Sequence, residues 1–142
     1  MSRIERGRVV LRIVLGAVYL LAGVAHLRSP GVFLSITPAW VPAPELVIAA
    51  TGVAEIAGAV ALVGLRPLRR AAAIGLALYA VCVYPANVKH ALDAVAAHGP
   101  DAWWPYHAPR LAFQPVFVWW ALFAGGVISW PWQARTSGQS KT

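Results

Sequence analysis

The residue of this chain most able to do chemistry is Glu55, which lies in the middle of the apolar stretch 45–65 (ELVIAATGVAEIAGAVALVGL). A stretch of about twenty apolar or small residues predicts a helix that spans a membrane. A charged side chain at the centre of such a helix costs roughly 2.5–3.5 kcal/mol, so Glu55 is expected to face protein groups and to mark a functional site. A carboxyl group at that depth is a candidate for exchanging protons with a ligand.

Four more polar residues lie in the outer half of other apolar stretches, with depth counted at about 1.5 Å per residue. His26 ends the first stretch, Asn87 lies near the end of the third, and Arg110 and Gln114 share one face at the start of the fourth. We expect them to converge with Glu55 in the outer half of a helical bundle and to form a ligand-binding site. Three further residues are expected to support this site: Tyr19, Thr51 and Tyr84.

Each of these residues also has a plainer interpretation. A protonated Glu55 can hold helices together through hydrogen bonds to Asn87 or His26, and His26 can be an ordinary histidine at the membrane interface. Asn87 and Gln114 are typical of hydrogen bonds between membrane helices. Arg110 can extend toward lipid headgroups. Both interpretations stay open on the sequence alone.

Metal and thiol chemistry have little support in the residues. Cys82 is the one cysteine, which excludes an intramolecular disulfide and a CxxC redox pair. The histidines of the predicted outer side, His90, His98 and His107, lack a recognisable metal-ligand spacing. We predict no metal site, and no cofactor is visible in the chain.

Composition points to an integral membrane protein. The chain has 142 residues, of which 59% are hydrophobic and 12% charged, with a mean hydropathy of +0.63. A soluble domain carries about 25% charged residues.

The net charge of +7 could suggest nucleic acid, but the positions of the charges indicate membrane topology instead. Nine of the 12 basic residues precede the first stretch or open it, or lie in the turn after the second or beyond the fourth, and the other three are Arg28, Lys89 and Arg110. Positive charge gathers on the cytoplasmic side.

We therefore predict an all-α, four-transmembrane-helix antiparallel bundle with both termini in the cytoplasm. The expected spans are 9–27, 45–65, 71–90 and 110–130, within a single membrane domain over 1–142. Pro85 should kink the third span because it lacks the N–H that would bond to Val81. The external loop 28–44 is rich in proline and should lie in the interface, and residues 133–142 should form a flexible cytoplasmic tail. The expected location is the inner (plasma) membrane of a cell, with the lipid bilayer as the first partner.

Five short motifs occur in an order that resembles a known family. They are LAGVAH (21–26), TPAWVP (37–42), TGVAEI (51–56), YPAN (84–87), and Arg110-Leu111 followed by Gln114 and Trp119-Trp120. Over about residues 9–130 this order is similar to the DoxX-like family of small four-helix integral membrane proteins. The resemblance implies the bundle and, through the thiosulfate:quinone oxidoreductase that gave the family its name, a link to quinones. A related animal branch resembles receptor-assembly chaperones.

Three functional hypotheses follow. The first is a redox-associated subunit with a quinone or small-molecule pocket, in which Glu55 and His26 supply protons and Asn87, Arg110 and Gln114 supply hydrogen-bond donors. Electrons would then come from a redox partner subunit or from the substrate, because no redox centre is visible. Whether such a protein is itself an enzyme stays open. The second is a non-enzymatic scaffold or assembly factor for a partner protein. The third, less supported, is a small-solute transporter, which could require a homo-oligomer. Nucleic acid is not expected as a partner.

Overall fold

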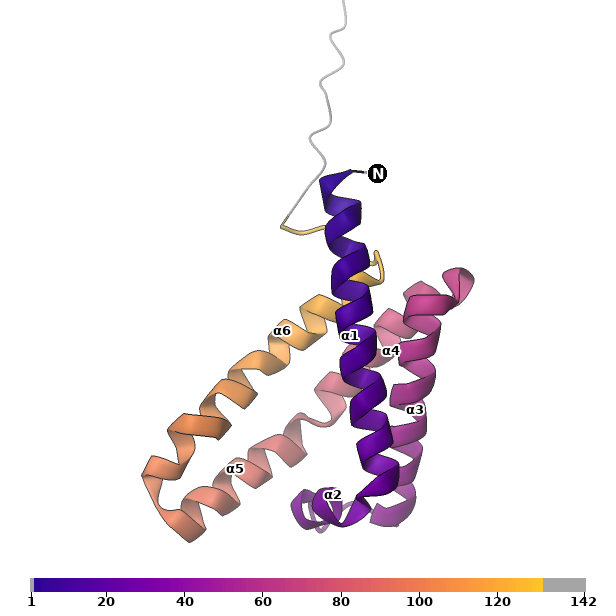
Figure 1. Ribbon diagram of the computed structural model, residues 1–142. Helices are drawn as coiled ribbons and strands as arrows, with labels where there is room; N and C mark the ends of the chain where they lie inside the picture. Colours follow the sequence, from indigo (N-terminus) through magenta and orange to yellow (C-terminus); the bar gives the residue numbers. More distant parts are fainter. Residues whose placement is uncertain (1, 132–142) are drawn as a thin grey trace, which may run out of the picture.

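The computed structural model describes residues 2–131, which form helices and connecting turns without a β-strand among them (Figure 1). The helices are α1 (Arg3–Arg28), α2 (Pro30–Ile36), α3 (Pro44–Gly64), α4 (Arg69–Cys82), α5 (Tyr84–His98) and α6 (Ala108–Ala124). The short 3₁₀ turn η1 (Arg66–Leu68) joins α3 to α4. A second 3₁₀ turn, η2 (Pro100–Ala102), and a π-helical turn, η3 (Trp103–His107), join α5 to α6. The prediction of an all-α protein is confirmed for this part of the chain.

Four helices close into a ring. Helix α1 packs on α3, α3 on α4, α4 on α6 and α6 back on α1. Figure 1 shows the N-terminus, the α3–α4 turn and the end of α6 at one end of the bundle, with α2 and the α5–α6 connection at the other. Neighbouring helices therefore run in opposite directions, as short connections favour.

Among the described residues, three segments are long and apolar enough to cross a membrane: Arg3–Arg28, Pro44–Gly64 and Arg66–His98. Their outer faces carry large apolar side chains, such as Leu21, Leu46 and Leu78, that no other part of the described chain covers. An apolar exterior of this kind suits lipid and identifies a membrane protein.

Three of the expected spans differ by more than two residues at one end from the helices of the structure, and the first of these helices begins at Arg3 rather than at residue 9. The third does not end at residue 90: α5 continues to His98, after a break at Val83 that precedes Pro85. The fourth ends at Ala124, short of residue 130, because Gly125 and Gly126 follow and Gly126 has a positive φ of 73°. With 17 residues, α6 is about 26 Å long and so slightly shorter than a typical hydrocarbon core. The predicted tail 133–142 lies outside the described residues.

Arginines fasten the helix ends at the N-terminal end of the bundle. Arg12 is buried and donates from Nε to the carbonyl of Ala124 at 3.0 Å, and Arg8 donates to the carbonyl of Ile128 at 3.0 Å. Arg69 donates to the carbonyl of Leu62 at 3.1 Å. Positive side chains are favourable at the negative C-terminal ends of helices. These arginines therefore bind the bundle together, besides contributing to the charge asymmetry.

Candidate ligand-binding site

A cavity of about 330 Å³ opens between α1 and α3 on one side and the α4–α5 break and α6 on the other. Its wall is mostly apolar and contains every predicted site residue except Tyr84, namely Tyr19, His26, Thr51, Glu55, Asn87, Arg110 and Gln114. Tyr84 is exposed at the start of α5 and does not line the cavity. Convergence of polar residues from different helices, expected from their depth, is therefore observed, while their binding of a ligand stays a prediction.

Close contact between α1 and α3 positions one side of the site. Gly23 and Gly52 lie where the two backbones meet, and a Cβ atom at Gly23 would lie only 2.6 Å from the carbonyl oxygen of Gly52. Both glycines are buried. Small residues at such crossings let membrane helices approach closely. The next turn of each helix then brings His26 and Glu55 face to face.

Glu55 and His26 form the polar pair on this side. Glu55 is 3% exposed, and its Oε2 lies 2.7 Å from Nδ1 of His26. The same nitrogen lies 3.1 Å from the carbonyl oxygen of Ala22. A proton on Nδ1 would point toward Ala22 and leave Oε2 without an aligned donor. A proton on the carboxyl group instead lets Glu55 donate to Nδ1, which satisfies both groups. The prediction that Glu55 faces the other helices within reach of His26 is confirmed.

Tyrosine and threonine side chains surround the carboxyl group. The side chain of Tyr79, from α4, interacts with Glu55 and with Thr51, and Tyr19 lines the same cavity. The Tyr19 hydroxyl donates to the carbonyl of Leu76 at 3.3 Å, and the two tyrosine rings meet edge to face. Sequence reasoning missed Tyr79, because a tyrosine in an apolar helix resembles ordinary packing until the rotation of that helix is known.

On the other side of the cavity, amide groups form a chain of hydrogen bonds with one direction. Arg110 donates to Oδ1 of Asn87 at 2.6 Å, and Asn87 donates to Oε1 of Gln114 at 3.1 Å. Gln114 in turn donates to the carbonyl oxygen of Ala80. Because arginine can only donate, this order fixes the orientation of both amides. Asn87 thus bonds to α6, and not to Glu55 as one interpretation of the sequence allowed.

The break before Pro85 supplies the last acceptor of that chain. Pro85 has no N–H to give to the preceding turn, so carbonyl groups of α4 lose their helical partners there. Reasoning from the sequence pointed to the carbonyl of Val81, whereas the carbonyl that Gln114 uses is that of Ala80. The kink thereby becomes a contact point between α4 and α6.

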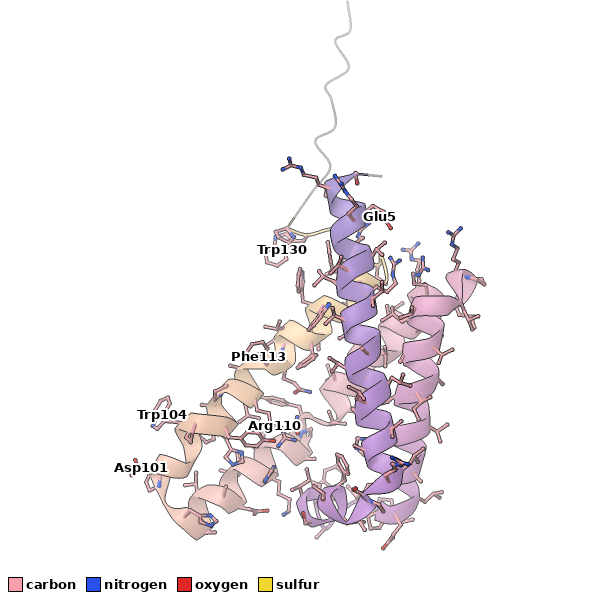
Figure 2. The ribbon with its side chains drawn as sticks, viewed as in Figure 1. Glu5, Asp101, Trp104, Arg110, Phe113 and Trp130 are labelled. Carbon is pink, nitrogen blue, oxygen red and sulfur yellow. The ribbon has the colours of Figure 1, made fainter. Side chains whose placement is uncertain are left out.

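Two aromatic rings contact Arg110 outside the cavity, and the ring of His107 packs against both of them. Nη1 of Arg110 lies 2.7 Å from Nδ1 of His90. Because a guanidinium can only donate, Nδ1 of His90 must be the acceptor of this hydrogen bond. The ring of His90 meets those of Tyr106 and His107 edge to face, and the guanidinium carbon of Arg110 lies 5.5 Å from the centre of the Tyr106 ring. Figure 2 shows Arg110 reaching from α6 toward the interior of the bundle, whereas Trp104 points outward at the α5–α6 end.

The proline-rich segment after α1 completes the wall. It forms the short helix α2 and then an irregular stretch that contributes Thr37, Trp40 and Val41 to the lining. Phe33 stacks on the ring of His26 with 3.7 Å between the ring centres. Its apolar residues were expected to lie at the membrane interface, but part of the segment encloses the cavity. Sequence reasoning gave no sign of the Phe33–His26 contact.

The site offers groups for proton exchange and for binding oxygen atoms, but no cluster of metal ligands. Within residues 2–131, no group of three or more His, Cys, Asp or Glu side chains comes together as a metal site would require. Cys82 also lines the cavity and is exposed, with no second cysteine in the chain to join it. The chemistry that the arrangement favours is acid–base exchange at Glu55–His26 and hydrogen bonding or charge neutralisation at Arg110.

A closed ring of apolar helices around a partly polar cavity defines this chain as a helical membrane protein with a candidate ligand site. Residues 15–125 match the model of a family described as a domain of unknown function (DUF8561), and the chain belongs to that family. No curated protein and no solved structure matches it. The matched region includes the Glu55–His26 pair and the hydrogen-bonded chain from Arg110 through Asn87 and Gln114.

Proposed function

We propose that this protein binds a small apolar molecule with ring carbonyl groups, of the quinone class, inside the bundle. The observation that carries this proposal is the pairing of a mostly apolar cavity of about 330 Å³ with two separate polar groups on its wall. That volume lies at the lower end of the range for small-molecule sites, which suits one substituted ring. A quinone presents two carbonyl oxygens on an apolar ring, so each polar group can take one of them.

The two groups have different roles in this proposal. Glu55 and His26 hold one exchangeable proton between them and can donate it to a carbonyl oxygen of the ring. Gln114 and Asn87 are held in place by their own hydrogen bonds and orient Arg110, whose remaining N–H groups are available to the other oxygen. The electrons for any redox step come from a partner subunit or from the substrate. On this view the protein is a redox-associated subunit.

The membrane arrangement is part of the proposal. Helices α1, α3, the bent α4–α5 segment and α6 would be four spans, with the arginine-rich end in the cytoplasm. The cavity would then lie in the outer half of an inner (plasma) membrane. The order of motifs that resembles DoxX-like proteins supports this arrangement and the association with quinones.

Cys82 provides a direct test because it is the only cysteine and lines the cavity. The protein in lipid nanodiscs is treated with a small, membrane-permeant thiol reagent, with and without a neutral short-chain ubiquinone. Bound quinone is expected to slow the modification of Cys82. The matched control carries Cys82→Ser and Leu78→Cys, which moves the thiol to a lipid-facing position on α4 outside the cavity. Equal effects of quinone on both proteins, or no effect on either, would reject the proposal.

A scaffold function is the second candidate, and one observation favours it. The hydrogen bonds from Arg110 through Asn87 and Gln114 to Ala80 join α5 and α6 to α4 without any ligand. If they serve only to hold the bundle together, a stoichiometric partner protein should co-purify from native membranes while no quinone does. Native mass spectrometry from native lipids distinguishes the two candidates.

A further inference from the structure

We infer that the ligand of this cavity carries a negative charge, and that Arg110 receives its anionic oxygen. This inference rests on the proposed function and deepens it by naming the charge of the ligand. The chemistry in question is a single oxyanion on an apolar body. Its source can be an acidic ring hydroxyl of a quinone or the carboxylate of a lipid.

The first step is that Arg110 has no acidic partner among the described residues. In the described residues its side chain donates to neutral acceptors, Asn87 and His90, and no carboxylate lies within ion-pair distance of it. The nearest acidic residue along α5, Asp93, is exposed and paired with Lys89. Asp101 lies at the far corner of the α5–α6 connection, away from Arg110 (Figure 2). A half-buried guanidinium in an apolar protein is costly unless its charge is balanced.

The second step is that the other polar group does not supply the balancing charge. The carboxyl group of Glu55 faces His26 at 2.7 Å and forms no ion pair with Arg110. A carboxylic acid beside a neutral imidazole has no net charge, and neither does a carboxylate beside an imidazolium. With one proton on that pair, Arg110 is, among the described residues, the one charge in the cavity wall that no neighbouring group balances.

The third step concerns the helix ends. Arg110 lies in the first turn of α6 and Asn87 in the first turn of α5, and neither of these turns contains an acidic residue. Helices α1 and α3 differ, since Glu5 and Glu45 occupy their first turns. The N-terminal end of a helix carries partial positive charge, which adds to that of Arg110. An anion in the cavity would be favoured by both.

Arginine also suits the geometry of an oxyanion. Its planar group carries five N–H donors in a fixed arrangement, and here the chain through Asn87, Gln114 and Ala80 holds it in one orientation. A charge-assisted hydrogen bond of this kind contributes about 10- to 100-fold to an affinity. Loss of the charge at Arg110 should therefore reduce binding of an acidic ligand by that factor.

The test compares acids with their neutral derivatives in nanodiscs of uncharged lipid. The probes are an alkylated hydroxynaphthoquinone and its methoxy ether, and oleic acid and its methyl ester. Binding is measured by the protection of Cys82, in the wild type, Arg110→Gln, Arg110→Lys and Arg28→Gln. Arg28 is an exposed arginine at the same end of the bundle and does not line the cavity, so it is the matched control.

We expect at least one acid to bind roughly tenfold or more tightly than its neutral derivative. That preference should disappear in Arg110→Gln, persist at least partly in Arg110→Lys, and remain in Arg28→Gln. Equal binding of acid and neutral derivative by the wild type overturns the inference, as does a preference that survives in Arg110→Gln. If Arg110→Gln does not fold, the inference is tested by the preference for acid over neutral derivative in the wild type and in Arg110→Lys.

The outcomes also separate this inference from the proposed function. Binding of both naphthoquinones with equal affinity leaves the quinone site standing and rejects the anionic ligand. Arg110-dependent binding of oleic acid without any binding of naphthoquinone supports the anionic ligand and rejects the quinone site. Failure of all four probes to bind the wild type rejects both.

Discussion

Gly23 of α1 lies directly against the backbone of Gly52 of α3, and this contact brings His26 to Glu55. A side chain at Gly23 would also meet Ile56 at 2.7 Å and Glu55 at 3.1 Å, so α1 cannot stay in place if one is added. The contact between His26 and Glu55 therefore depends on the absence of a side chain at Gly23 and at Gly52.

Gly23→Ala is expected to push α1 away from α3 and to lower the free energy of unfolding by about 1–3 kcal/mol, the range for overpacking in a core. It should also weaken quinone binding, because the distance between His26 and Glu55 increases. Thermal unfolding in nanodiscs and Cys82 protection measure the two effects. Gly7→Ala is the control in the same helix, since no atom lies near that position. A Gly23→Ala protein as stable as Gly7→Ala would contradict the packing argument.

Glu55→Gln separates proton exchange from helix contact. Glutamine keeps the size and hydrogen-bonding capacity of the side chain but cannot titrate, so the variant should fold normally and lose quinone retention. Glu55→Leu removes the contact with His26 and should cost about 0.6 kcal/mol, the average for hydrogen bonds between membrane helices. Val53→Leu, on the lipid-facing side of α3, should change neither property. A Gln variant that retains quinone would reject the proton-exchange role and favour the scaffold.

Gln114→Leu should loosen the α4–α6 contact at the break before Pro85. The substitution removes a donor from the Ala80 carbonyl and an acceptor from Asn87. Leaving such groups unpaired away from water costs about 1–3 kcal/mol, with smaller values typical within membranes. The stability of the variant is compared with that of Phe113→Leu, the neighbouring exposed residue labelled in Figure 2. Equal stability of the two variants would show that this hydrogen bond does not hold the break.

The proposed topology predicts opposite accessibility at the two ends of the bundle. In a Cys82→Ser background, Ala97→Cys at the α5–α6 end should react with a membrane-impermeant maleimide added outside intact cells. Leu68→Cys, in the α3–α4 turn at the other end, should react only after the membrane is opened. Both positions are exposed in the structure. The reverse pattern would invert the orientation, and labelling of both from outside would rule out the four-span arrangement.

Much of the site could be predicted because burial of charge in a membrane is so costly. Glu55 had to face protein, and Tyr19, which was expected to support the site, is indeed buried in α1. The second expected span, 45–65, agrees with α3 to within one residue at each end, since Pro44 and the arginines after Leu65 delimit this helix clearly. Local signals of this kind do not depend on how helices tilt or rotate.

The contacts that sequence reasoning missed depend on that tilt and rotation. Nothing local to Tyr79 indicates that it turns toward Glu55, or that Asn87 turns toward Arg110. Phe33 stacks on His26 only because the chain after Arg28 folds back under α1. The early end of α6 was missed because the residues after Gly126 remain apolar, so hydropathy continues where the helix does not.

The hydrogen bond from Arg12 to the carbonyl of Ala124 has a consequence for how the protein is made. The two residues are 112 positions apart, so Arg12 is synthesised long before its acceptor. The same holds for Arg8 and Ile128, which are 120 positions apart. During synthesis Arg8 and Arg12 are therefore without these two acceptors until the C-terminal part of the bundle has been made. Packing of α6 against α1 is the step that supplies these acceptors.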